Sequence, residues 1–253
     1  MVLRTIGPHR SFGGEGGIRA AMSALTMLAA VGNFTALGFR LAVYMLASLA
    51  VCMSAREYAR ARVAVSLGDP TPRLWGRLTW SPRAWFDPFG SGVLPALIAV
   101  LWTVEALLIP AAYGKPAPVD PSRFRRHVRD VIVVSVAGPI ATLALGIAAG
   151  LVVRIVGGPS ELARLAMTFC FTSMSLTVFH LLPIPGLDGA RMLALALPPD
   201  AARAYRGFDR YLPLSVLVIV FLFSSLALGI LTALSGALCN AASGQDCLLA
   251  LRF

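Results

Sequence analysis

The amino-acid sequence predicts an all-α integral membrane protein, and three observations indicate this fold class. Hydrophobic residues make up 57% of the 253 residues and charged residues only 13%, whereas soluble domains carry about 25% charged residues. The apolar residues gather in about six runs, and roughly 20 apolar residues are enough to cross a bilayer as a helix. The net charge of +10 comes largely from arginines in the short segments between these runs.

Each apolar run is predicted to be a helix, because a segment in lipid must satisfy its own backbone hydrogen bonds. A polar, glycine-rich tail over 1–18 precedes the runs, and a tail over 237–253 follows them. A single membrane domain is therefore predicted over 19–236. Its apolar runs cover about 19–34, 40–62, 91–113, 130–155, 163–187 and 211–236.

The segment between the second and third runs is polar and rich in proline and aromatic residues. Residues 77–80 (Arg-Leu-Thr-Trp) alternate polar and apolar side chains. This alternation predicts a short β-strand that lies at the membrane interface.

The positions of the basic residues predict the orientation in the membrane. Arginines concentrate in 56–90, 114–130 and 188–210, and all three segments are expected to be cytoplasmic. The first two are separated only by the run 91–113, which contains glycines, prolines and a lone Glu105. We therefore expect this run to re-enter or break rather than cross. The N-terminus is then cytoplasmic and the C-terminus lies outside.

The positive charge is expected to contact anionic lipid head groups and not nucleic acid, because the arginines flank membrane segments. The four cysteines fall into two classes. Cys52 and Cys170 lie inside apolar runs and are predicted to pack as small hydrophobic residues. Cys239 and Cys247 flank a polar turn, where either a disulfide on an oxidising side of the membrane or two free thiols are consistent with the sequence.

One apolar run ends with ionisable residues at helical spacing. Arg56 and Arg60 are one turn apart on one face, and Glu57 lies beside them. Alone, this pattern also fits arginines that extend to the lipid head groups.

A second apolar run ends at residues 179–189, where two prolines and two glycines interrupt the helix beside Asp188. An aspartate so close to hydrocarbon is costly and is expected to have a partner. In the topology above, both run ends lie at the same membrane depth. We expect Arg56 or Arg60 to form a bidentate pair with Asp188 and Glu57 to complete the network.

The chain resembles a known family over about residues 40–195. The segment 68–90, the Gly-Lys-Pro-Ala-Pro-Val block at 114–119, the Ala-Gly-Pro block at 137–139 and the motif at 181–189 occur in the family's order. They are similar to the site-2 proteases, intramembrane zinc metalloproteases, and among them to the short bacterial members. The resemblance implies a site-2-protease-like helical bundle in the bacterial cytoplasmic membrane.

The resemblance also implies roles for the clustered residues. In this family a His-Glu-x-x-His helix binds zinc, its glutamate acts as general base, and an aspartate completes the ligands. Glu57 matches the general base and Asp188 the aspartate ligand, whereas Arg56 and Arg60 occupy both histidine positions. His180 stands where the family has asparagine. Guanidinium has no lone pair for zinc, so no zinc is expected at these positions.

Three functions follow from these observations. The first is a non-catalytic pseudoprotease that binds membrane-protein partners or substrates and needs no cofactor. The second is an active metalloprotease with a relocated zinc site, with His180, Asp188, Glu57 and Cys52 as candidate ligands. The third is a small transporter or channel subunit, which only the broken run 91–113 and its Glu105 suggest.

Overall fold

The structure is a computed structural model that describes residues 36–103, 109–213, 216 and 226–251. These residues are helical or irregular and contain no strand, which agrees with the predicted all-α class. Three of their helices are long and apolar enough to cross a membrane: α2 (Ala36–Ser66), α6 (His127–Val156) and α7 (Glu161–Leu181). The run predicted at 19–34 and part of that at 211–236 lie outside the described residues.

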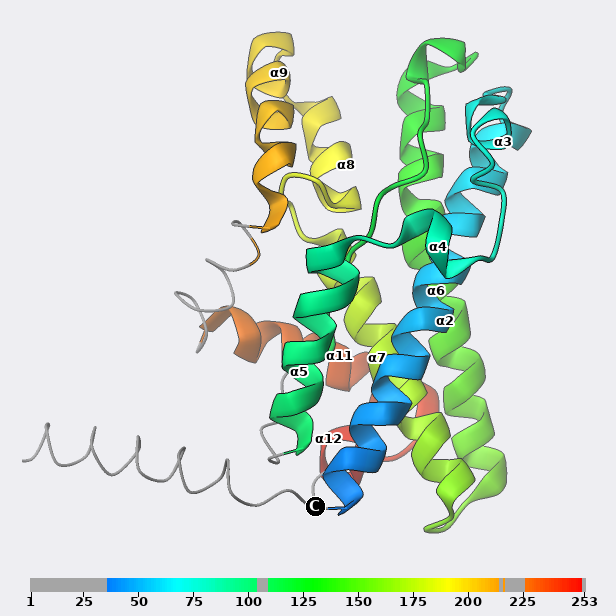
Figure 1. The fold of residues 1–253 in the computed structure, drawn as a ribbon, viewed down its shortest axis with the longest axis vertical. Coiled ribbons are helices and arrows are strands. Elements are labelled where there is room, and N and C mark those ends of the chain that lie inside the picture. The colour runs from blue at the N-terminus through cyan, green and yellow to red at the C-terminus, as the bar shows by residue number, and fades with distance from the viewer. Residues whose placement is uncertain (1–35, 104–108, 214–215, 217–225, 252–253) are drawn as a thin grey trace, which may run out of the picture.

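Shorter elements connect these helices; α5 and α11 lie along the bundle, and others lie at its two ends (Figure 1). We call one end of the bundle the arginine-rich end, because it holds arginines of the segments 56–90, 114–130 and 188–210. This end carries α3, α8 and α9, and the opposite end carries α12. In chain order they are α3 (Thr71–Leu74), α4 (Pro82–Trp85), the π-helix η1 (Pro88–Val93), α5 (Leu94–Thr103), the 3-10 helix η2 (Pro121–Arg123), α8 (Asp188–Ala196), α9 (Pro199–Gly207), the 3-10 helix η3 (Phe208–Tyr211), α11 (Leu226–Ser243) and α12 (Cys247–Ala250).

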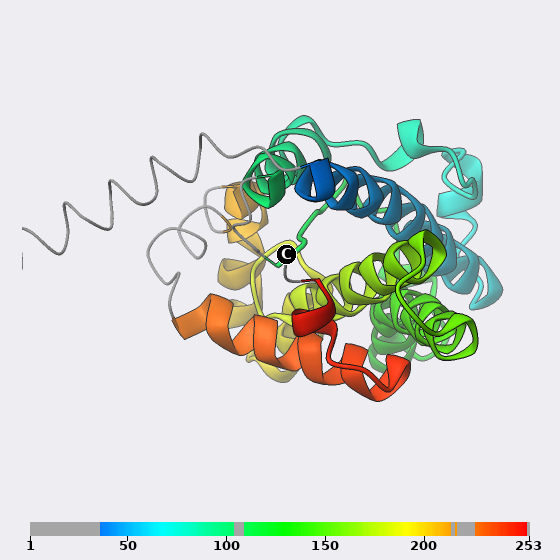
Figure 2. The ribbon, with the colours of Figure 1, turned by 90° about the horizontal axis from the view of Figure 1, so that it is seen from below.

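Helix α7 forms the centre of the bundle, with α2, α6 and α11 packed around it (Figure 2). Its side chains Cys170 and Phe171 are fully buried. The helix begins cleanly because the hydroxyl of the N-cap residue Ser160 accepts the Ala163 N–H at 3.1 Å. As predicted, α2 and α7 run in the same direction, so their C-terminal ends reach the same end of the molecule (Figure 1).

The predicted strand at 77–80 is not formed. Residues 78–79 make a bend and their neighbours are irregular, and none of the described segments is a strand that could complete a ladder with them. The Trp80 ring instead stacks on Tyr58 of α2, with ring centroids 5.1 Å apart. The alternation of side chains therefore reflects one aromatic contact with a helix and not a sheet.

The first and last residues of the run 91–113 lie side by side. The Tyr113 N–H donates to the Gly90 carbonyl at 3.1 Å, and the Ser91 hydroxyl donates to the Tyr113 carbonyl at 2.7 Å. A Cβ on Gly90 would lie 2.4 Å from the Tyr113 ring, so only glycine allows this approach. These contacts agree with the predicted re-entrant path, whereas a full crossing would separate the two ends. Glu105 lies outside the described residues.

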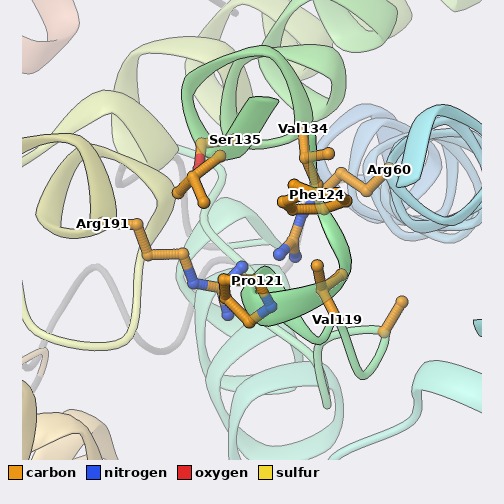
Figure 3. A pocket seen from close by; sticks show the side chains of 9 residues that line it. Arg60, Val119, Pro121, Phe124, Val134, Ser135 and Arg191 are labelled. Carbon is orange, nitrogen blue, oxygen red and sulfur yellow. The ribbon is translucent and has the colours of Figure 1, made fainter. Parts of the chain in front are cut away.

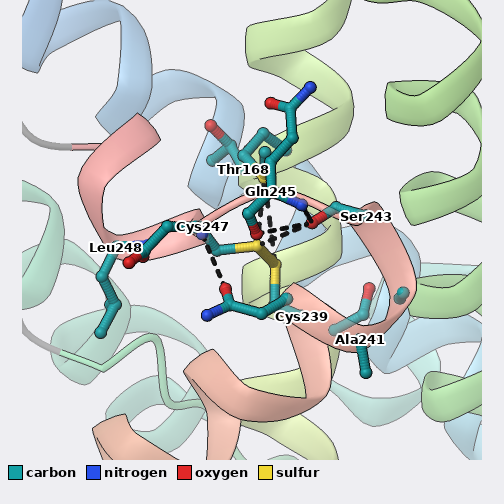
Figure 4. Close-up of a disulfide and its surroundings, with 12 residues drawn as sticks. Thr168, Cys239, Ala241, Ser243, Gln245, Cys247 and Leu248 are labelled. Carbon is teal, nitrogen blue, oxygen red and sulfur yellow. Dashed lines mark hydrogen bonds between the residues drawn. A yellow bond between two sulfur atoms is a disulfide. The ribbon is translucent and has the colours of Figure 1, made fainter.

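Cys239 and Cys247 form a disulfide at the end of the bundle opposite the arginine-rich loops (Figures 1 and 4). Their Cα atoms are 6.1 Å apart, and the Asn240 side chain accepts the Cys247 N–H at 2.7 Å. The structure thus selects the bridged alternative. Cys52 and Cys170 are fully buried, as predicted for small hydrophobic residues.

Candidate functional site

The ionisable residues of the two run ends meet inside the arginine-rich end of the bundle. Arg56, Glu57 and Arg60 come from α2, and Asp188 is the first residue of α8. Their exposed fractions are 3%, 5%, 2% and 1%, so the arginines do not extend to the surface. A positive φ of 94° at Gly186 lets the chain turn between α7 and α8, which brings Asp188 back to α2.

Arg56 bridges the two carboxylates. Its Nη1 donates to Glu57 Oε1 and its Nη2 donates to Asp188 Oδ2. Arg60 Nη1 lies 3.4 Å from both Glu57 oxygens, and its Nε lies 3.5 Å from Asp188 Oδ1. The network forms as expected, but the bidentate Arg–Asp188 pair does not. The Arg56 guanidinium does not bind Asp188 through two nitrogens, because its Nη1 donates to Glu57, the next residue in the chain.

Two further groups complete the cluster. The Ala117 N–H donates to Glu57 Oε2 at 3.0 Å, and Arg191 Nη1 lies 3.6 Å from Asp188 Oδ1. Sequence reasoning did not include either. Arg191 could have been found, since it follows Asp188 by three residues on a helix. Ala117 offered no signal, because its contact uses the backbone of a loop that is distant in the sequence.

Gly138 of α6 makes room for the arginines. A Cβ there would lie 2.9 Å from Arg56 Cγ and 3.1 Å from Arg60 Cδ. The Ala-Gly-Pro block therefore places a bare stretch of α6 against the aliphatic parts of both side chains. The absence of a side chain at this position lets both arginines lie close to α6 while their guanidinium groups contact the carboxylates.

His180 and Cys52 do not join a metal-ligand set. His180 Nδ1 pairs with the Leu176 carbonyl at 2.9 Å, and its Nε2 has no hydrogen-bond partner among the described residues. Cys52 Sγ lies 3.1 Å from Ser173 Oγ. Within the part of the chain that the structure describes, no three His, Cys, Asp or Glu residues lie close enough to hold a metal ion.

Comparison with known proteins decides the family. The chain is 30% identical over 165 residues to the "Putative zinc metalloprotease YwhC" of Bacillus subtilis, covering 62% of this chain and 70% of that protein. It is 30% identical over 186 residues to the "Putative zinc metalloprotease Rip2" of Mycobacterium tuberculosis, covering 73% and 68%. The chain belongs to the site-2 protease family. No family model and no solved structure matches it.

The residues of this site-2 protease family member do not fit the zinc ion of the family. A zinc ligand must offer a lone pair, which a guanidinium lacks. Arg56 and Arg60 also place two permanent positive charges between Glu57 and Asp188, where they would repel a dication. Together with the three long apolar helices, family membership identifies a membrane protein.

Proposed function

We propose that this member of the site-2 protease family is a non-catalytic pseudoprotease. It binds membrane-protein partners or substrates in the bacterial cytoplasmic membrane without cleaving them. One observation carries the proposal: the Arg56 guanidinium pairs with both Glu57 and Asp188, the two acidic residues that catalysis in the family needs.

The state of Glu57 supports this proposal. A general base needs a free lone pair close to the water molecule that it activates. Glu57 Oε1 accepts from Arg56, Oε2 accepts from the Ala117 N–H at 3.0 Å, and Arg60 lies 3.4 Å from both oxygens. Both carboxylate oxygens therefore already accept hydrogen bonds from groups of the protein, which compete with a water molecule for the same lone pairs.

The exposed surface supports a multi-pass orientation with the N-terminus and the arginine-rich end in the cytoplasm. Trp75 and Trp80 are 71% and 55% exposed at this end, which fits a membrane interface on either side, and the arginines of this end assign it to the cytoplasm. The Cys239–Cys247 disulfide at the opposite end fits the oxidising side of the membrane.

A second candidate function is an active metalloprotease with a relocated zinc site. His180 Nε2 favours it, because this nitrogen has no hydrogen-bond partner in the part of the chain that the structure describes, and an imidazole with one free nitrogen is a common zinc ligand. Asp188 would first have to leave its arginines to serve as a second ligand.

The test uses the full chain, purified in detergent and reconstituted with a membrane-embedded peptide substrate. We expect substoichiometric zinc by elemental analysis and no cleavage. The double variant Arg56→His/Arg60→His should bind zinc, and adding Asp188→Asn to it should reduce that binding.

Stoichiometric zinc in the unmodified protein, or cleavage that Glu57→Gln abolishes, would refute the pseudoprotease function. Zinc that disappears in His180→Ala would establish the relocated site instead. The double variant serves as the positive control for the metal analysis.

A further inference from the structure

A cavity of about 160 Å³ lies beside the ion-pair cluster, bounded by α2, α6, α8 and the loop that follows Tyr113. Val119, Phe124 and Val131 form apolar walls. Arg60 and Arg191 enter it from α2 and α8, and their guanidinium groups point towards each other across the cavity (Figure 3). The space therefore combines an apolar body with a cationic wall.

The cluster beside the cavity carries one unbalanced positive charge. Among the described residues, the guanidinium groups of Arg56, Arg60 and Arg191 face two carboxylates, those of Glu57 and Asp188. Arg60 is 2% exposed, and its contacts with the carboxylates are long: 3.4 Å from Nη1 to Glu57 and 3.5 Å from Nε to Asp188 Oδ1. Arg191 makes only a loose contact of 3.6 Å with Asp188, and its side chain is 30% exposed.

Like charges that face each other across a partly apolar cavity repel, and an anion between them relieves the repulsion. A single excess charge matches a monoanion better than a phosphate dianion. The Ser135 hydroxyl on the wall can donate a further hydrogen bond. The apolar walls favour a ligand with a hydrocarbon part, and a cavity of about 150 Å³ holds a molecule the size of benzene.

We propose that this cavity binds a monovalent carboxylate with a compact aliphatic body. Arg60 and Arg191 pair with the carboxylate, and Val119, Phe124 and Val131 contact the hydrocarbon. A free short-chain carboxylic acid and the C-terminal valine or leucine of a partner peptide share this chemistry. The site is independent of the proposed pseudoprotease function, because the cavity is the same whether or not the protein cleaves peptides.

The experiment measures binding of 3-methylbutanoate to the full chain in detergent by titration calorimetry. We expect saturable binding that the neutral isostere 3-methylbutanamide does not show. Arg191→Gln should weaken binding at least tenfold by removing a charge-assisted contact, on the order expected for such bonds. Val131→Phe should abolish it by filling the cavity.

Two matched variants control for charge and bulk. Arg203→Gln removes an exposed arginine from the same end, and Val133→Phe enlarges an exposed residue of α6. Both should bind 3-methylbutanoate as the unmodified protein does. Equal binding of the amide, unchanged affinity in both Arg191→Gln and Val131→Phe, or binding of inorganic phosphate in preference to the carboxylate would overturn the proposal.

A last arm distinguishes the two sources of the carboxylate. A short peptide that ends in a free leucine and the same peptide with an amidated end each compete with 3-methylbutanoate. Stronger competition by the free-acid peptide than by 3-methylbutanoate itself assigns the site to a partner's C-terminus. Weaker competition assigns it to a small carboxylic acid.

Discussion

Replacement of Asp188 by leucine should destabilise the protein more than any exposed charge substitution. Asp188 is 1% exposed and faces Arg56 directly, with Arg60 and Arg191 at 3.5 and 3.6 Å. In Asp188→Leu, three guanidinium groups share Glu57 alone. Removing one partner of a buried ion pair costs about 3–5 kcal/mol. For a chain of this size this corresponds to a decrease in Tm of about 6–20 °C.

The assay is thermal unfolding of the detergent-purified protein, followed by tryptophan fluorescence. Adding Arg56→Met to Asp188→Leu restores the original charge balance and should recover much of the lost stability. Asp200→Leu is the matched control, because Asp200 pairs with Arg203 at the surface and contributes at most about 1 kcal/mol. The reasoning fails if Asp188→Leu lowers the Tm no more than Asp200→Leu, or if the double variant recovers nothing.

Three further predictions test other parts of the structure. Gly138→Ala should cost about 1–3 kcal/mol because its Cβ would displace both buried arginines, whereas Gly229→Ala, with open space around it, should cost nothing measurable by thermal unfolding. Cys239→Ser should cost about 2–3 kcal/mol through the lost cross-link to Cys247, and a reductant should not lower the stability of this variant further. Partial desolvation raises the pKa of Asp209, so its contribution to stability is complete at low pH and is lost as the pH rises through that raised pKa. Asp209→Asn should remove this loss, and urea unfolding of both proteins across that pH range should show no divergence if the assignment is wrong.

Much of the site follows from local sequence pattern. Helical spacing places Arg56 and Arg60 on one face, and the proline and glycine residues before Asp188 end one helix and begin another. The distribution of arginines indicated that both run ends lie at the same depth. These inferences succeed because each depends on a few neighbouring residues and on the high cost of charge near hydrocarbon.

Other features could not be predicted, because they depend on which surfaces meet. Trp80 stacks on Tyr58 instead of pairing in a strand, since a strand needs a partner that local alternation does not reveal. The contact of Ala117 with Glu57 joins residues that are sixty positions apart. Its donor is a backbone N–H, which every residue but proline carries.

Composition, hydrophobic periodicity and the placement of the arginines predicted a helical membrane protein and a cluster of charges where its two run ends meet. These properties depend on neighbouring residues or add up along the chain, so they can be predicted without knowledge of the packing. The bridging geometry of Arg56, the return of the run 91–113 and the cavity between Arg60 and Arg191 emerged only in three dimensions. Each of them arises because segments far apart in sequence approach each other closely. Differences of a few tenths of an ångström in interatomic distance then determine which atoms form hydrogen bonds.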